Sequence, residues 1–157
     1  MAVEQYALRK SIDWLCDEGY ADEGCIGVCG LSYGALNALY LSALDQRAKA
    51  CLASCIFADR DKQIRPDLSY ENGGKKLYDA ELAALIYPRK LWIQVGQIDT
   101  AVKLENALFE YERLQKLTKD VQEEWLDFWA FEGGHEFVRD NTQLDAFMKE
   151  LWSHVTA

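Results

Sequence analysis

Three residues of this 157-residue chain have the types that nucleophilic catalysis requires. Ser32 lies in residues 30–34, with the sequence GLSYG, and the only two histidines are His135 and His154. A serine hydroxyl becomes a nucleophile when a histidine takes its proton, and a carboxylate then holds that histidine in the correct tautomer. Asp99 completes the chain order serine, acid, histidine. Ser32, Asp99 and His135 are therefore the candidate catalytic residues.

The residues around Ser32 predict a tight turn between a strand and a helix. An apolar run precedes the serine and a helical pattern follows it, so the hydroxyl would project from the turn. The turn brings the residues two before and two after the serine close together. We expect that side chains at these two positions would clash, and that Gly30 and Gly34 avoid the clash because they have none. The backbone N–H of Tyr33 would point at a developing oxyanion. A glycine-rich turn with an incidental serine is the alternative interpretation.

His135 is the candidate base. His154 lies three residues from the end of the chain on a polar helical segment, where a solvated role is expected. His135 follows a predicted strand, and Gly133 and Gly134 before it would let the loop turn sharply enough to aim the imidazole at Ser32. A loop histidine can also be a simple surface residue, but its place in the chain order favours catalysis.

Three acids could orient His135. Asp99 follows a predicted strand, and sites form at the carboxyl ends of parallel strands. It could instead cap a helix predicted to begin near residue 102. Asp127 lies within a predicted strand, and Glu136 stands beside the histidine and would point away. We therefore prefer Asp99 as the acid.

Hydrophobic periodicity predicts strands that alternate with helices. The predicted strands are residues 25–29, 50–57, 91–95 and 125–131, and the predicted helices are residues 4–18, 33–44, 77–86, 102–117 and 141–154. Residues 58–77 show no clear period and are predicted to be irregular. This order indicates an α/β fold, a parallel sheet of four strands flanked by helices, in a single domain over residues 1–157.

Composition and charge narrow the choice of partners and location. Half of the residues are apolar, enough to bury a core. The net charge of −9 repels phosphate backbones and anionic lipids, so we expect no nucleic acid or membrane partner. No apolar run approaches the roughly 18 residues that span a bilayer, and the first residues lack the pattern of a signal peptide. A cytoplasmic location is expected.

The five cysteines are Cys16, Cys25, Cys29, Cys51 and Cys55. They form no C-x-x-C pair and have only two histidines as possible companions, so a zinc site is not expected. We interpret them as small buried thiols in a reducing compartment. A cysteine-based redox or metal protein is the weakest functional hypothesis.

The sequence resembles an α/β-hydrolase from its nucleophile onward. Residues 25–34 resemble the fifth strand and nucleophile elbow of that fold, and residues 43–50 resemble the lead into its sixth strand. Residues 82–100 are similar to the approach to the acid in dienelactone-hydrolase-like and acetyl-xylan-esterase-like members. The resemblance implies a serine esterase that cleaves a small-molecule ester through an acyl-enzyme on Ser32. It implies neither a metal nor an organic cofactor.

The resemblance also implies a truncated α/β-hydrolase fold. Such hydrolases place further strands before the elbow, and a loop among these supplies the second oxyanion N–H. The loss of one donor costs about 10²–10³ in rate. The strand at residues 25–29, apolar on both faces, would become a sheet edge with unpaired backbone groups. We expect a second copy of the chain, a separate N-terminal half or the rest of a longer hydrolase to cover it.

Two functional hypotheses follow. The first is a serine esterase that is active alone or as a homodimer that completes the site. The second is an incomplete or non-catalytic hydrolase module that keeps the triad residues and needs a partner or a missing N-terminal half. Turnover of short p-nitrophenyl esters with ordinary enzyme efficiency would contradict the second hypothesis.

Overall fold

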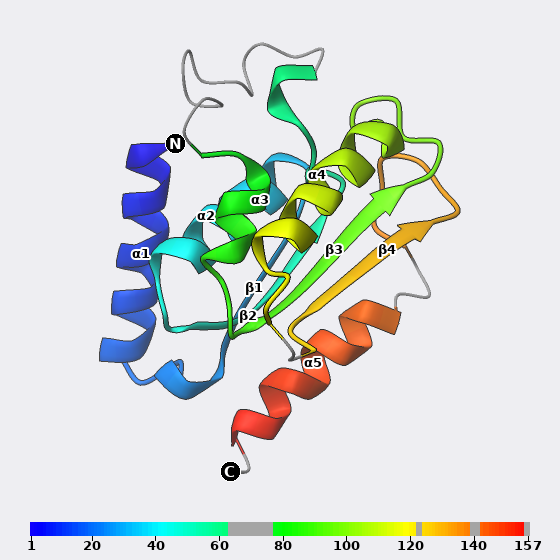
Figure 1. Cartoon of the computed structure of the whole chain (residues 1–157). Helices are drawn as coiled ribbons and strands as arrows, with labels where there is room; N and C mark the ends of the chain where they lie inside the picture. Colours follow the sequence, from blue (N-terminus) through cyan, green and yellow to red (C-terminus); the bar gives the residue numbers. More distant parts are fainter. Residues whose placement is uncertain (63–76, 122–123, 139–141, 156–157) are drawn as a thin grey trace.

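The computed structural model describes residues 1–62, 77–121, 124–138 and 142–155 (Figure 1). They contain one four-stranded parallel sheet, in which strands that follow one another in the chain are also neighbours in space. Its strands are β1 (Ile26–Leu31), β2 (Ala48–Ser54), β3 (Lys90–Gly96) and β4 (Leu126–Phe131). The predicted α/β fold with four parallel strands is confirmed.

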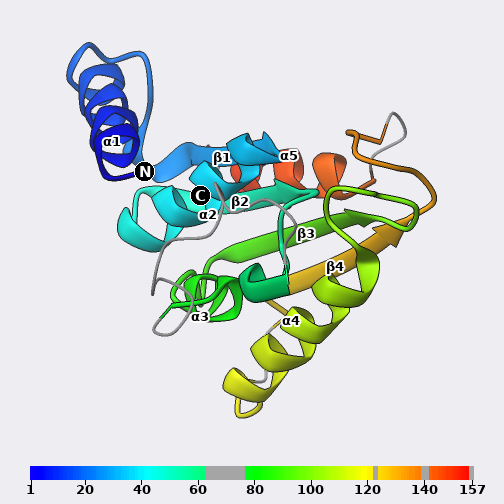
Figure 2. The same cartoon turned by 90° about the horizontal axis from the view of Figure 1, so that it is seen from above.

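Helices cover both faces of this sheet. The helices of the described chain are α1 (Ala2–Asp17), α2 (Tyr33–Leu44), α3 (Asp79–Ala84), α4 (Leu104–Leu117) and α5 (Thr142–Val155), with short 3₁₀ helices η1 (Glu23–Cys25) and η2 (Arg60–Lys62). Helices α2, α3 and α4 lie on one face and α5 lies on the other (Figures 1 and 2). Within the described residues, no helix has both the length and the apolar character needed to span a membrane.

The element boundaries differ from the prediction most at the second strand. Strand β2 ends at Ser54 rather than at residue 57, because Cys55 has a φ of 54° and turns the chain out of the sheet. Residues 55–58 are fully buried, which is why their apolar run reads as a strand in the sequence. Of the segment predicted to be irregular, residues 63–76 lie outside the described part of the chain.

Burial separates the central strands from the edge. Most residues of β2 and β3 are buried, whereas no residue of β1 is. The hydrophobic run of β1 predicts burial on both faces, but the strand is the sheet edge within the described chain and stays half-exposed. The expectation of five buried thiols is wrong for Cys29, which is exposed on β1, and for Cys16 and Cys25, which lie outside the sheet and are half-buried.

Helix α1 stands apart from the sheet, beyond β1 (Figure 2). It packs against α2 and is held there by polar contacts, such as the hydrogen bond from Gln5 Nε2 to Asn37 Oδ1 at 2.8 Å. Large apolar side chains of α1, including Val3, Tyr6 and Trp14, remain 55–80% exposed. Helix α1 thus lies beside the free edge of β1 and carries exposed apolar side chains.

Candidate active site

Ser32 forms the turn between β1 and α2. Its backbone has φ 55° and ψ −123°, a conformation that costs a non-glycine residue about 1–3 kcal/mol. The Ser32 N–H donates to the carbonyl of Ser54 at 2.9 Å, and the Ser32 carbonyl accepts from the N–H of Leu36 at 3.0 Å. The neighbouring strand and the first turn of the helix therefore hold the strained residue in place.

The two glycines of the turn have different roles. A Cβ on Gly30 would lie 2.3 Å from the carbonyl carbon of Gly34 and 2.6 Å from the nitrogen of Ala35, so no side chain fits there. A Cβ on Gly34 would meet no atom within 4 Å. The expected close approach across the turn is present. The expected steric need for glycine is correct for Gly30 and wrong for Gly34, whose Cβ direction is open.

Tyr33 is the first residue of α2. Backbone N–H groups in the first turn of a helix have no intrahelical acceptor, and the helix dipole makes that end partly positive. The Tyr33 N–H can therefore serve as an oxyanion donor beside Ser32. The Tyr33 phenol has another partner, because its hydroxyl donates to the carboxylate of Glu4 on α1 at 2.7 Å.

Asp99 and His135 are brought together. Asp99 Oδ2 lies 2.8 Å from His135 Nδ1, and the other carboxylate oxygen accepts the N–H groups of Ala101 and Val102 at 2.7 and 3.0 Å. The Asp99 side chain is fully buried, whereas that of His135 is 32% exposed. Asp99 does not cap α4, since Lys103 holds the N-cap position. One oxygen fixes the acid in its own loop, and the other is free to orient the imidazole.

The alternative acids and base lie in other contacts. Asp127 is exposed at the start of β4. Glu136 turns back into its own loop, where Oε1 accepts the N–H of Gly134 at 3.2 Å. His154 pairs with Glu150 on α5 at 3.5 Å. Neither alternative acid is bonded to His135 among the contacts of the described residues.

The loop that carries His135 runs back from β4 over the end of β3. The carbonyl of Gly133 accepts the N–H of Ile98 at 3.0 Å. Gly96, the last residue of β3, lies so close beneath this loop that a Cβ would be 2.1 Å from the carbonyl oxygen of Gly134. The absence of a side chain at Gly96 is thus what lets the histidine loop settle on the sheet.

The same loop reaches the end of β2, where it meets Cys55. The Cys55 sulfur lies 3.7 Å from the carbonyl oxygen of Gly134 and 3.6 Å from that of Glu136, so its one S–H can donate to either oxygen. Burial raises the pKa of this thiol, so it remains a neutral donor. Because the strand order is β1-β2-β3-β4, the loop carries His135 from one edge of the sheet toward Ser32 at the other.

The Ser32 hydroxyl makes no hydrogen bond to His135 among the contacts of the described residues. Catalytic hydrogen bonds are often long in free enzymes and tighten when substrate binds, so this does not remove His135 as the base. The structure therefore joins Asp99 to His135 directly and brings Ser32 to the same end of the sheet.

Two residues of the site were not singled out by the sequence, namely Gly96 and Cys55. Gly96 directly follows a predicted strand and Cys55 lies within another, which is the only signal that the sequence offers for them. Their importance comes from contacts with the loop at Gly134, which is 38 residues beyond Gly96 and 79 residues beyond Cys55. Hydrophobic periodicity carries no information on such contacts.

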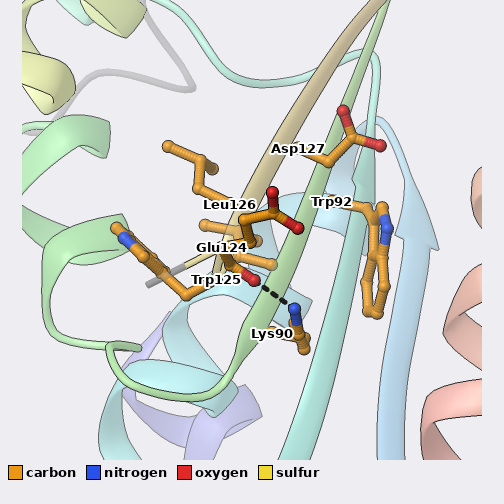
Figure 3. Close-up of a pocket in the computed structure, with 7 residues that line it drawn as sticks. Lys90, Trp92, Glu124, Trp125, Leu126 and Asp127 are labelled. Atoms are coloured by element: carbon orange, nitrogen blue, oxygen red, sulfur yellow. Dashed lines mark hydrogen bonds between the residues drawn. The ribbon is translucent and has the colours of Figure 1, made fainter. Parts of the chain in front are cut away.

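A hollow of about 400 Å³ lies at the opposite end of the sheet (Figure 3). The first residues of β3 and β4 line it, and Lys90 Nζ donates to the backbone carbonyl of Glu124. Ser32, Asp99 and His135 follow the carboxyl ends of their strands, whereas this hollow lies at the amino ends. It is therefore separate from the candidate active site.

Comparison with known proteins identifies the family. The family model described as X-Pro dipeptidyl-peptidase (S15 family) matches residues 1–132, which is most of the chain. The chain belongs to the S15 family. The comparisons thus support the α/β-hydrolase superfamily that the sequence resembles, through a family other than the dienelactone-hydrolase-like and acetyl-xylan-esterase-like groups. No curated protein matches the chain.

Solved structures share the fold of this S15-family chain. They include a glucuronoyl esterase from Solibacter usitatus, with a TM-score of 0.72, 16% identity and coverage of 94% of this chain and 48% of that one. A cold-adapted esterase from an Arctic intertidal metagenomic library has a TM-score of 0.69, 18% identity and coverage of 96% and 59%. An esterase from Pyrococcus furiosus has a TM-score of 0.64, 20% identity and coverage of 96% and 60%. The chain spans roughly half the length of these structures.

Proposed function

We propose that this chain is a serine hydrolase of carboxylic esters, with Ser32 as nucleophile, His135 as base and Asp99 as the acid that orients it. The observation that carries the proposal is the 2.8 Å contact between Asp99 and His135, at the same end of the sheet as the strained turn of Ser32. Membership of a hydrolase family and structural likeness to esterases support it.

The first half of the proposed reaction forms an acyl-enzyme. Ser32 Oγ attacks the ester carbonyl while His135 takes the hydroxyl proton, and the Tyr33 N–H stabilises the oxyanion. The C–O bond to the alcohol then breaks, and His135 gives its proton to the departing alkoxide. Asp99 keeps the proton on the His135 nitrogen that faces it and stabilises the imidazolium.

The second half releases the acid. His135 takes a proton from water, whose oxygen attacks the acyl carbon, and the bond to Ser32 Oγ breaks with return of that proton to the serine. Asp99 and the Tyr33 N–H have the same roles as before. No group outside these residues is needed to balance the two steps.

A fluorophosphonate probe tests the nucleophile. Mass spectrometry of the labelled wild-type chain is expected to find the phosphonyl group on Ser32, and Ser32→Ala should not be labelled. Ser11→Ala, which removes an exposed serine of α1, is the matched control and should label like the wild type. Equal labelling of Ser32→Ala would contradict the proposal. A panel of short esters and X-Pro amides would show whether the bond cleaved is an ester or an amide.

Gly96→Ala is expected to displace the histidine loop. The new Cβ would meet the carbonyl of Gly134 at 2.1 Å, so the loop must lift away from β3. A displacement of about 1 Å at a reacting group costs roughly 10² in rate, so we expect kcat to fall by that factor. Gly134→Ala, where a Cβ meets nothing within 4 Å, is the control in the same loop. If Gly96→Ala keeps the wild-type kcat, the position of the histidine loop does not depend on its close packing against Gly96.

An incomplete module that needs further polypeptide is the second candidate. Strand β1 has a free edge in the described sheet, and α1, which lies beyond β1, carries exposed apolar side chains (Figure 2). A hydrolase N-terminal half that adds a parallel strand beside β1 would cover both, and the chain spans roughly half the length of its structural neighbours. Sedimentation of the purified chain distinguishes this partner from a homodimer, because a homodimer doubles the mass.

A further inference from the structure

Three side chains of metal-binding type meet at the candidate active site. Within the described residues, the Cys55 sulfur, a carboxylate oxygen of Asp99 and a ring nitrogen of His135 all lie within 4.8 Å of one another. Cys55 and Asp99 are buried, and His135 is partly exposed. The three residues come from segments far apart in the chain, so no cysteine spacing in the sequence could indicate the cluster.

The backbone at Cys55 supports a specific role for this thiol. In the described chain, Ser32 and Cys55 are the two non-glycine residues with positive φ. Such a conformation costs about 1–3 kcal/mol and tends to persist at functional sites. At Cys55 it accompanies a sulfur that lies under the histidine loop, 3.6 Å from the carbonyl oxygen of Glu136. The alternative is that the thiol only ties down the loop.

We propose that Cys55, Asp99 and His135 form a binding site for a thiophilic divalent cation such as Zn²⁺, which inhibits the hydrolase when bound. The proposal rests on the proposed function for its inhibitory effect and on the cluster alone for the binding. Zn²⁺ takes thiolate, carboxylate and imidazole ligands with bonds of about 2.0–2.3 Å. Ligand atoms around one ion lie roughly 3.5 Å from one another. A pair at the present limit of 4.8 Å must therefore close by about 1.3 Å, whereas Asp99 Oδ2 and His135 Nδ1, now 2.8 Å apart, must separate.

Binding would compete with catalysis. As the sulfur–zinc bond forms, the thiol releases its proton to solvent, and the proton on His135 Nδ1 moves through solvent to Nε2 so that Nδ1 can bind the ion. The cation then occupies the carboxylate and the imidazole that now pair with each other, so Asp99 can no longer orient His135 toward Ser32. Mg²⁺ and Ca²⁺ prefer oxygen ligands and should not bind this cluster.

Cadmium absorption tests the binding without any need for enzyme activity. In a background with Cys16→Ser, Cys25→Ser and Cys29→Ser, only the buried Cys51 and Cys55 remain as thiols. Titration with Cd²⁺ is expected to give a thiolate-to-metal absorption band that saturates at one ion per chain. The band should persist in Cys51→Ala and disappear in Cys55→Ala and in Cys55→Ser, the variant closest in shape.

The ligand role of Asp99 separates a cluster from a lone thiol. Loss of a residue that hydrogen-bonds to a metal ligand weakens metal binding roughly 10–100-fold. Because Asp99 is proposed as a ligand itself, Asp99→Asn in the same background should weaken Cd²⁺ binding by at least this factor. Unchanged binding in Asp99→Asn, or a band that persists without Cys55, would overturn the proposal. Circular dichroism of each variant verifies that it is folded.

Inhibition is measured by the labelling of Ser32. Zn²⁺ is expected to slow fluorophosphonate labelling of the wild type and of Cys51→Ala, a chelator should restore it, and Cys55→Ala should lose this sensitivity. Labelling that Zn²⁺ leaves unchanged in the wild type would overturn the inhibitory role. Absence of Ser32 labelling in every variant would instead contradict the proposed function, while the cadmium band would still decide the metal site.

Discussion

Asp99→Asn is expected to lower kcat about 10⁴-fold while the fold is preserved. The amide oxygen of asparagine can still accept the N–H groups of Ala101 and Val102, which now bond Asp99 Oδ1. The amide nitrogen would then face His135 Nδ1 and donate to it, which places the imidazole proton on the wrong nitrogen. The variant therefore keeps the loop and removes the orientation of the base.

The measurement compares Asp99→Asn with the wild-type chain in the rate of ester hydrolysis or of fluorophosphonate labelling. Asp127→Asn is the matched control, since Asp127 is an exposed acid on β4 without a contact to His135. It should keep wild-type activity. An equal loss in both variants, or none in Asp99→Asn, would remove Asp99 from the role of orienting acid.

Chain order and local pattern were enough to predict that Asp99 and His135 meet at the end of the sheet. The serine turn depends on neighbours within about two residues, and a parallel sheet places the ends of its strands at one edge. Asp99 and His135 are therefore found in contact although 36 residues separate them. The exact reach of Ser32 toward His135 is not fixed by such patterns, because it depends on how the loop after β4 crosses the sheet.

The positions that the sequence did not indicate depend on nonlocal packing. An apolar run such as residues 50–57 has the same appearance whether it continues as strand or turns at Cys55 and stays buried. Gly96 is similar, because the carbonyl of Gly134 that excludes a side chain comes from another loop. Strand β1 is half-exposed although its sequence is apolar. Such a sequence predicts a neighbouring strand on each side, whereas the described chain places a strand on one side only.

Gly30→Ala and Gly34→Ala are expected to change stability in opposite directions. The Cβ of alanine at residue 30 would meet the backbone of Gly34 and Ala35 at 2.3–2.6 Å, and backbone atoms cannot rotate away as a side chain can. We expect a loss of about 3 kcal/mol or more in the free energy of unfolding, at the upper end of overpacking effects. The serine turn would distort as well, so labelling of Ser32 should fall.

At Gly34 the expected sign is reversed. Its Cβ position is open and the residue lies in the first turn of α2, without a positive φ. Alanine there reduces the freedom of the unfolded chain and should add about 0.5–1 kcal/mol of stability. Urea unfolding of both variants measures the two changes in the free energy of unfolding. The dependence of that free energy on urea concentration, the slope m, is compared with that of the wild type. Destabilisation of similar size in both would mean that the turn needs two glycines, as the sequence pattern alone suggests, and that the open space at Gly34 is not available to a side chain.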